Sequence, residues 1–376
     1  MIISVPKETA KDERRVSLTP EVASQFVKDG MEVRVEQNAG LASNYLDESY
    51  EEVGAKIVND ANEVYGEADL ILKIQPPNEE EMEHIKEGTV LVCLLWALSN
   101  KELIEDLKNR GITALGMEAI PRISRAQNMD VLSSMSSLSG YKAALMGADH
   151  LDRYMPMMMT AAGTIPPAKV LVLGAGVAGL QAIATAKRLG AVVEAFDIRP
   201  AVKEQVESLG AKFVEVPLEE ADTETKGGYA KELSKNSQQR QREVIHEHAE
   251  KSDMIITTAL IPGKPAPLLV TKEMVEDMKP GSIVVDMAAE QGGNCAETKP
   301  GENINKNDVI IMGPLNIPSK MAFHASKLYA KNMQALLKLL IQEGEFNFDF
   351  EDEIIENTTI THKGEIISPM LKDDES

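Results

Sequence analysis

Three glycines carry the clearest chemical signal in this sequence. Gly174, Gly176 and Gly179 follow the apolar run 170–173, and apolar residues at helical spacing continue after them. In a strand–turn–helix unit, the first glycine permits a tight turn, the second lets a pyrophosphate approach the backbone, and the third lets the helix pack closely on the strand. The N-terminal N–H groups and the dipole of that helix then favour the negative charge. The spacing therefore predicts a dinucleotide-binding turn.

Asp197 supplies the acidic residue that such a site requires. It ends a second apolar run, 192–196, roughly twenty residues beyond the glycines. A carboxylate at this place accepts hydrogen bonds from the adenosine ribose and repels a 2′-phosphate. We therefore expect NAD(H), although the nearby Arg199 keeps NADP(H) open. A packing turn without a ligand is the other interpretation of the same residues.

Apolar runs and helical patterns alternate along the chain, which is typical of an α/β fold with parallel sheets. Strands are expected at residues 2–5, 31–35, 56–58, 69–74, 89–95, 170–173, 192–196, 212–216, 254–258, 283–287 and 309–312. Helices are expected at 20–30, 78–87, 101–110, 177–189, 201–209 and 321–341, and a small hairpin near 358–367. The sequence thus predicts two Rossmann-like parallel-sheet domains with a cofactor cleft between them. Residues 1–130 plus 325–376 would form an N-terminal α/β domain, and residues 131–324 an NAD(H)-binding domain.

Three further segments favour a role near the cofactor without requiring it. The polar segment 117–142 joins the two domains, and it is either a cofactor contact or a linker with its own ion pairs. The polar stretch 217–253 contains Gly227-Gly228-Tyr229 and is either a mobile lid or an exposed helical excursion. Residues 257–263 follow a strand and should face the cofactor. The methionines of 154–167 are expected to fill the core.

Composition excludes several other classes of protein. The chain has 376 residues, with 60 acidic against 39 basic side chains and a formal net charge of −21. This charge argues against nucleic acid and anionic lipid as partners, because both are themselves negative. Cys93 and Cys295 form neither a disulfide framework nor a zinc-site spacing, so we expect no metal and a reducing compartment. The apolar stretches are too short or too interrupted to span a bilayer, so we expect no direct membrane insertion.

Several long motifs resemble one family over nearly the whole chain. RISRAQNMD, MMMTAAGTIPPAKVLVLGAGVAGLQAIATAKRLGA, KEQVESLGAKF, GGYAKE and TTALIPGKPAP closely resemble the NAD(H)-binding domain I, or alpha subunit, of proton-translocating nicotinamide nucleotide transhydrogenase. Alanine dehydrogenases belong to the same superfamily. The chain departs from them at Gln75, where they carry a catalytic lysine, and in the segment around Trp96, where it lacks their catalytic histidine.

The resemblance implies a particular set of site residues. Arg122, Gln127, Asp130 and Ser133 would hold the nicotinamide and its ribose and form the catalytic set, with Gln127 nearest the second cofactor. The remaining residues expected to bind NAD(H) are Asn128, Met129, Gly174, Gly176, Val177, Gly179, Asp197, Ile198, Arg199, Gly228, Tyr229, Ala259 and Leu260. Hydride transfer between two nicotinamide rings needs positioning rather than acid–base groups, because the reacting atoms belong to the cofactors.

The resemblance also implies partners. NADP(H) would be held by a beta subunit, proton translocation would take place in membrane-spanning subunits, and this chain would pair as a homodimer. It would then be cytoplasmic and peripheral at the inner face of the cell membrane. Two other functions stay open. One is a self-sufficient dehydrogenase of alanine or a related 2-oxo acid, favoured by Arg14-Arg15 and opposed by Gln75 and Trp96; the other is a non-catalytic NAD(H)-sensing module.

Overall fold

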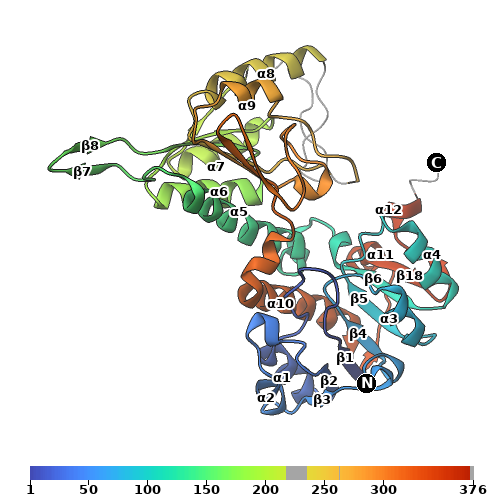
Figure 1. The fold of residues 1–376 in the computed structure, drawn as a ribbon. Coiled ribbons are helices and arrows are strands. Elements are labelled where there is room, and N and C mark those ends of the chain that lie inside the picture. The colour runs from blue at the N-terminus through green and yellow to red at the C-terminus, as the bar shows by residue number, and fades with distance from the viewer. Residues whose placement is uncertain (217–234, 262, 373–376) are drawn as a thin grey trace. The chain divides into compact units, whose positions relative to one another are not determined.

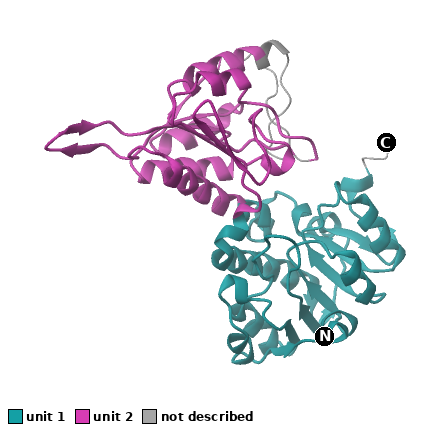
Figure 2. Cartoon of the chain, in the orientation of Figure 1, with its two compact units in different colours: residues 1–135, 318–376 teal, residues 136–317 magenta. Residues whose placement is uncertain are grey.

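The computed structural model describes residues 1–216, 235–261 and 263–372. The chain divides into two compact units, and each is described by itself (Figure 2). Unit 1 combines residues 1–135 with residues 318–376, and unit 2 is the continuous segment 136–317 between them. Both units are α/β, as the alternation of apolar runs and helical patterns predicts.

Unit 1 is built on an eight-stranded sheet with the order β19-β18-β6-β5-β4-β1-β2-β3. Strands β1 to β6 are mutually parallel, and β18 and β19 add an antiparallel edge. The expected strands 2–5, 56–58 and 89–95 are confirmed, whereas β6 was missed. The strands are β1 (Ile2–Val5), β2 (Glu32–Glu36), β3 (Lys56–Val58), β4 (Leu70–Leu72), β5 (Val90–Cys93), β6 (Thr113–Gly116), β18 (Thr359–His362) and β19 (Glu365–Ile366).

The helices of unit 1 follow local signals in the sequence. Asn78 and Glu81 form a capping box, because the Asn78 side chain accepts from the Glu81 N–H while the Glu81 carboxylate accepts from the Asn78 N–H. Pro20 begins the first helix, where its missing N–H costs nothing. The helices are α1 (Pro20–Lys28), α2 (Asp47–Glu51), α3 (Glu79–His84), α4 (Lys101–Asn109), α10 (Ala322–Leu340), α11 (Glu353–Thr358) and α12 (Pro369–Lys372), while α5 (Val131–His150) crosses from unit 1 into unit 2.

Unit 2 contains a seven-stranded sheet with the order β11-β10-β9-β12-β13-β15-β14. All its strands are parallel except β14, which forms an antiparallel pair with β15 and was not predicted. The strand order reverses between β9 and β12, and open α/β sheets bind their ligands at such a reversal. The strands are β9 (Lys169–Leu173), β10 (Val192–Phe196), β11 (Lys212–Phe213), β12 (Met254–Thr257), β13 (Ile283–Asp286), β14 (Asn303–Lys306) and β15 (Val309–Met312).

Helices cover both faces of this sheet, which explains its almost continuous apolar strands. Val170 and Val172 pack with α5 (Val131–His150), α6 (Val177–Arg188) and α7 (Lys203–Ser208). Leu171 and Leu173 point the other way, into a second apolar cluster with α8 (Lys235–Ala249) and α9 (Lys272–Asp277). Successive side chains of a strand enter the two clusters in turn, because they point to opposite faces of the sheet.

The expected role of the methionines in 154–167 is wrong for most of them. Met155 is buried, but Met157 and Met159 are exposed to 59% and 79%. The segment forms a hairpin of β7 (Met158–Thr160) and β8 (Gly163–Ile165), which pair with each other and extend away from the rest of unit 2 (Figure 1). Apolar composition alone did not reveal that this segment leaves the core.

Candidate functional site

The glycine-rich turn adopts the geometry that its sequence predicts. Gly174 lies directly after β9 with φ +99°, a backbone conformation that strongly favours glycine. A Cβ on Gly179 would lie 1.8 Å from the Gly174 carbonyl oxygen, so only glycine lets α6 pack this closely on the turn. Within the described residues, a Cβ on Gly176 would meet one atom within 4 Å, Arg199 Nη2 at 3.9 Å. The backbone at Gly176 is therefore open to approach, as a pyrophosphate requires.

Asp197 directly follows β10, and its carboxylate connects the end of β10 to the glycine-rich turn after β9. Its Oδ2 accepts a 2.7 Å hydrogen bond from the Ala175 N–H, inside the glycine-rich turn. Its Oδ1 accepts from the Arg199 backbone N–H and Nε, both at 2.9 Å, and Oδ2 accepts from Arg199 Nη2 at 2.8 Å. Asp197 and Arg199, both expected to bind the cofactor, thus form an ion pair with side chains only 6% and 15% exposed.

The segment after β12 approaches the same turn. Thr258 Oγ1 donates a 3.0 Å hydrogen bond to the Gly174 carbonyl, and Ala259 is partly exposed beside it. Asn294 holds Ala259 from both sides: its Oδ1 accepts from the Ala259 N–H at 3.0 Å, and its Nδ2 donates to the Ala259 carbonyl at 2.9 Å. Sequence reasoning missed Asn294, because a buried amide far along the chain gives no local pattern.

A second buried residue, Asp286, organises the neighbouring strand end in unit 2. Its carboxylate accepts from Thr257 Oγ1 at 2.8 Å and from Thr298 Oγ1 at 2.6 Å. It also accepts from the backbone N–H of Ala288 and of Cys295, each at 3.0 Å. Four donors satisfy the buried charge, so Asp286 is a structural anchor of this sheet edge.

The predicted residues of unit 2 therefore lie together around one edge of the sheet. Val177 and Leu260 are exposed to 43% and 40%, which leaves two apolar side chains open at this edge. The residues near the ends of β9, β10 and β12 are Gly174, Gly176, Val177, Gly179, Asp197, Ile198, Arg199, Ala259 and Leu260. Gly228 and Tyr229, expected on a lid, lie outside the residues that the structure describes.

The second predicted group lies in unit 1, in the turn η4 (Ser124–Met129) and the start of α5. Asp130 directly precedes α5: its Oδ1 accepts from the Ser133 N–H at 2.8 Å, and its Oδ2 accepts from Ser133 Oγ at 2.6 Å. Arg122, Gln127 and Asn128 are exposed, whereas Met129 is buried.

Two contacts hold this turn in place. Asn332 of α10 donates from Nδ2 to the Asn128 carbonyl at 2.8 Å. Arg125 makes two 2.7 Å hydrogen bonds to the Asp352 carboxylate at the start of α11. Both partners come from the C-terminal segment of unit 1, so the exposed Gln127 is carried on a fixed turn rather than a loose linker.

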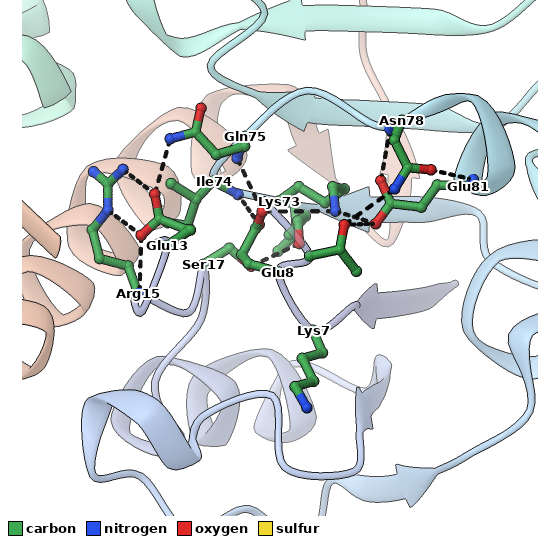
Figure 3. A network of polar contacts seen from close by, with 12 residues as sticks. Lys7, Glu8, Glu13, Arg15, Ser17, Lys73, Ile74, Gln75, Asn78 and Glu81 are labelled. Atoms are coloured by element: carbon green, nitrogen blue, oxygen red, sulfur yellow. Dashed lines mark hydrogen bonds and ion pairs between the residues drawn. The ribbon is translucent and has the colours of Figure 1, made fainter. Parts of the chain in front are cut away.

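Unit 1 also contains a buried polar network at the reversal of its own strand order, between β1 and β4 (Figure 3). Lys73 Nζ lies 2.8 Å from Glu81 Oε1 and 3.7 Å from Glu8 Oε2, and all three side chains are nearly inaccessible. Burial raises the pKa of Glu8 to about 7, although the cation of Lys73 and the backbone N–H of Ile74 lower it.

Arg15, one of the two basic residues that favour a 2-oxo acid dehydrogenase, is already paired. Its Nε and Nη2 donate to the two oxygens of Glu13 at 2.8 and 2.6 Å, and its side chain is 3% exposed. Gln75 donates from Nε2 to the same carboxylate at 2.9 Å. Glu13 thus binds both side chains, and its pKa is lowered to about 2 by these partners despite burial.

The fold and the unit 2 site together define a dinucleotide-binding α/β protein. Family models for the N-terminal and C-terminal domains of alanine dehydrogenase/PNT match residues 4–139 and 143–369. The chain belongs to the alanine dehydrogenase/PNT family.

Within this family the chain is more similar to transhydrogenase subunits than to alanine dehydrogenases. It is 50% identical to the first segment of the NAD(P) transhydrogenase alpha subunit of Rhodospirillum rubrum, with 99% of each chain covered. A transhydrogenase structure from Sinorhizobium meliloti matches with a TM-score of 0.88 and 44% identity, over 98% of this chain and 100% of that one. The alanine dehydrogenase of Bacillus subtilis is 34% identical over 78% of this chain and 72% of its own length. These relationships support nicotinamide nucleotide binding and transhydrogenase activity.

Proposed function

We propose that this chain is the NAD(H)-binding subunit of a proton-translocating transhydrogenase. It passes hydride between NAD(H) and an NADP(H) held by a partner beta subunit, and membrane-spanning subunits couple the transfer to proton translocation. The observation that carries this proposal is the glycine turn with Asp197, within a chain half identical along its full length to a transhydrogenase alpha subunit. Attachment to those subunits would place the chain at the inner face of the cell membrane.

The candidate residues of each unit suit cofactor positioning rather than acid–base catalysis. The Gly174–Gly179 turn supplies N–H groups for a pyrophosphate, and Asp197 is the acidic residue expected at the ribose end. On and beside the η4 turn, Arg122 and Gln127 are accessible side chains with hydrogen-bond donors suited to a nicotinamide amide and ribose. The bound cofactors supply the hydride chemistry, and these residues orient the nicotinamide for direct transfer.

The structure offers little support for a 2-oxo acid dehydrogenase. Arg15 and Gln75 both bind Glu13, so neither is available to a substrate carboxylate in this conformation. The segment around Trp96 lacks the catalytic histidine of alanine dehydrogenases, and Trp96 itself has no group that titrates near neutral pH. Reductive amination needs such a positioned acid or base.

A reconstituted transfer assay tests the proposal. The purified chain alone, the purified NADP(H)-binding partner alone, and their mixture would each receive NADPH and an acetylpyridine analogue of NAD⁺. We expect reduction of the analogue only in the mixture. Turnover of pyruvate, ammonia and NADH by the chain alone would support the dehydrogenase instead.

We also propose that the chain acts as a homodimer and that the β7–β8 hairpin belongs to the dimer contact. All six strand residues of this hairpin are exposed, and within the described chain the two strands pair only with each other. An isolated two-stranded hairpin is marginally stable, and exposed apolar side chains mark interaction surfaces. We expect Met159→Glu to shift the mass measured by light scattering from dimer toward monomer, while Lys187→Glu, on α6, leaves the dimer intact.

A further inference from the structure

The Asp197 carboxylate has no acceptor position left for a ribose. A carboxylate offers about four lone-pair positions. Asp197 already accepts four hydrogen bonds of 2.7 to 2.9 Å, one from Ala175 and three from Arg199. A ribose diol at this carboxylate would therefore have to replace a donor that is now bound.

Two of the four donors can leave without moving the backbone. The N–H groups of Ala175 and Arg199 are main-chain donors, whereas Nε and Nη2 of Arg199 belong to a side chain that can rotate. Nε occupies Oδ1 and Nη2 occupies Oδ2, so departure of the guanidinium frees one position on each oxygen. One position on each oxygen is what the two hydroxyls of a diol need.

The guanidinium also borders the pyrophosphate approach. A methyl group placed on Gly176 would lie 3.9 Å from Arg199 Nη2, and no other described atom outside its immediate chain neighbours and its own helix backbone would be within 4 Å. The head group thus lies beside the open face of the glycine-rich turn as well as on Asp197. A pyrophosphate at this turn would therefore lie within reach of the guanidinium.

We propose that Arg199 occupies the ribose subsite in the free protein, that the dinucleotide displaces it, and that this ion pair sets the selectivity between NAD(H) and NADP(H). The inference rests on the proposed function, because it assumes that NAD(H) binds at this turn. Displacement costs NAD(H) two charge-assisted hydrogen bonds. The released guanidinium is a suitable partner for a 2′-phosphate and partly offsets the repulsion from Asp197. Arg199 therefore weakens NAD(H) binding and reduces discrimination against NADP(H).

Calorimetric titration of NADH and NADPH into Arg199→Ala tests whether Arg199 has opposite effects on the affinities for the two nucleotides. We expect the Kd for NADH to fall about threefold and the Kd for NADPH to rise about tenfold, relative to the wild-type chain at the same ionic strength. Arg188→Ala, at the far end of α6, removes the same charge and should leave both constants within twofold. Arg199→Lys retains the charge without the fork and should give an intermediate selectivity, which provides a test if the alanine variant folds poorly.

The outcomes separate this inference from the proposed function. Weaker binding of NADH by Arg199→Ala and Arg199→Lys would overturn the inference, because Arg199 would then be a direct ligand of the cofactor. Equal changes for the two nucleotides would overturn it as well. If the wild-type chain binds neither nucleotide, the proposed function fails and the inference fails with it.

Discussion

The two glycines at the start of α6 should respond to alanine in different ways. A Cβ on Gly179 would have to move from 1.8 Å to at least 3.0 Å from the Gly174 oxygen, a shift of about 1.2 Å between helix and turn. Overpacking of this kind costs about 3 kcal/mol, and the better helix propensity of alanine returns about 1 kcal/mol. Gly179→Ala should therefore lose roughly 2 kcal/mol, or about 4–8 °C in Tm for a unit of this size.

Gly176→Ala is the matched control for stability and the test for binding. Gly176 is the N-cap of α6 with φ −75°, which alanine adopts freely, so the free energy of unfolding should change by no more than about 1 kcal/mol. The methyl group would nevertheless stand where a pyrophosphate must approach the backbone. We expect at least a tenfold weaker Kd for NADH, or about 1.4 kcal/mol.

Thermal melting of the two variants checks the predicted difference in stability, and calorimetric titration with NADH checks the predicted difference in binding. The reasoning would be refuted if Gly176→Ala bound NADH as tightly as the wild-type chain, because the backbone at Gly176 would then not face the cofactor. Unchanged melting of Gly179→Ala would refute the packing argument separately.

Two further perturbations address unit 1. Gln127→Asn keeps the amide but shortens its reach, so NADH affinity should change little while single-turnover transfer to the NADP(H) partner slows at least tenfold, about 1.4 kcal/mol of barrier; an unchanged rate would remove Gln127 from the transfer site. The pKa of Glu8 is raised from 4.5 to about 7 in the folded chain. Its contribution to the free energy of unfolding is therefore fully present below pH 4.5 and is lost as the pH rises through 7. Between pH 5 and 8 the free energy of unfolding of Glu8→Gln, measured with denaturant, should therefore rise by up to about 3 kcal/mol relative to that of the wild-type chain. Parallel plots of this free energy against pH for the two proteins would contradict the prediction.

Much of the fold could be predicted because local signals agree with one another. The β9 strand, its three glycines and α6 were expected, and the structure has them, since turn geometry, strand burial and helix periodicity all occur within some twenty residues. The strands β6 and β14 were missed, because each is short and the second lies on an edge with little apolar content. The hairpin near the C-terminus was expected, but its pairing with β6 spans the chain and leaves no local pattern.

The site was less predictable for the same physical reason. Asp197 could be placed at the end of β10, yet nothing in the sequence shows that Arg199 saturates its carboxylate. Asn294 and Asp286 support the β12 and β13 ends through contacts with distant segments. Residue types and spacing indicate which side chains could bind the cofactor. Whether those side chains already hydrogen-bond to other parts of the protein depends on contacts that the sequence does not show.

The order in which the two units occur along the chain has a consequence for synthesis on the ribosome. Unit 2 is continuous, but in unit 1 the strand β6, whose last residue is Gly116, gains its second neighbour only when it pairs with β18, which ends at His362. At about 5–20 residues per second, the 246 residues between these positions take roughly 12–50 s to emerge. During that interval β6 is an unpaired apolar edge of the kind that recruits other chains. The nascent N-terminal segment therefore has to keep this edge from other chains until β18 emerges, whereas all of the unit 2 sheet has by then been synthesised.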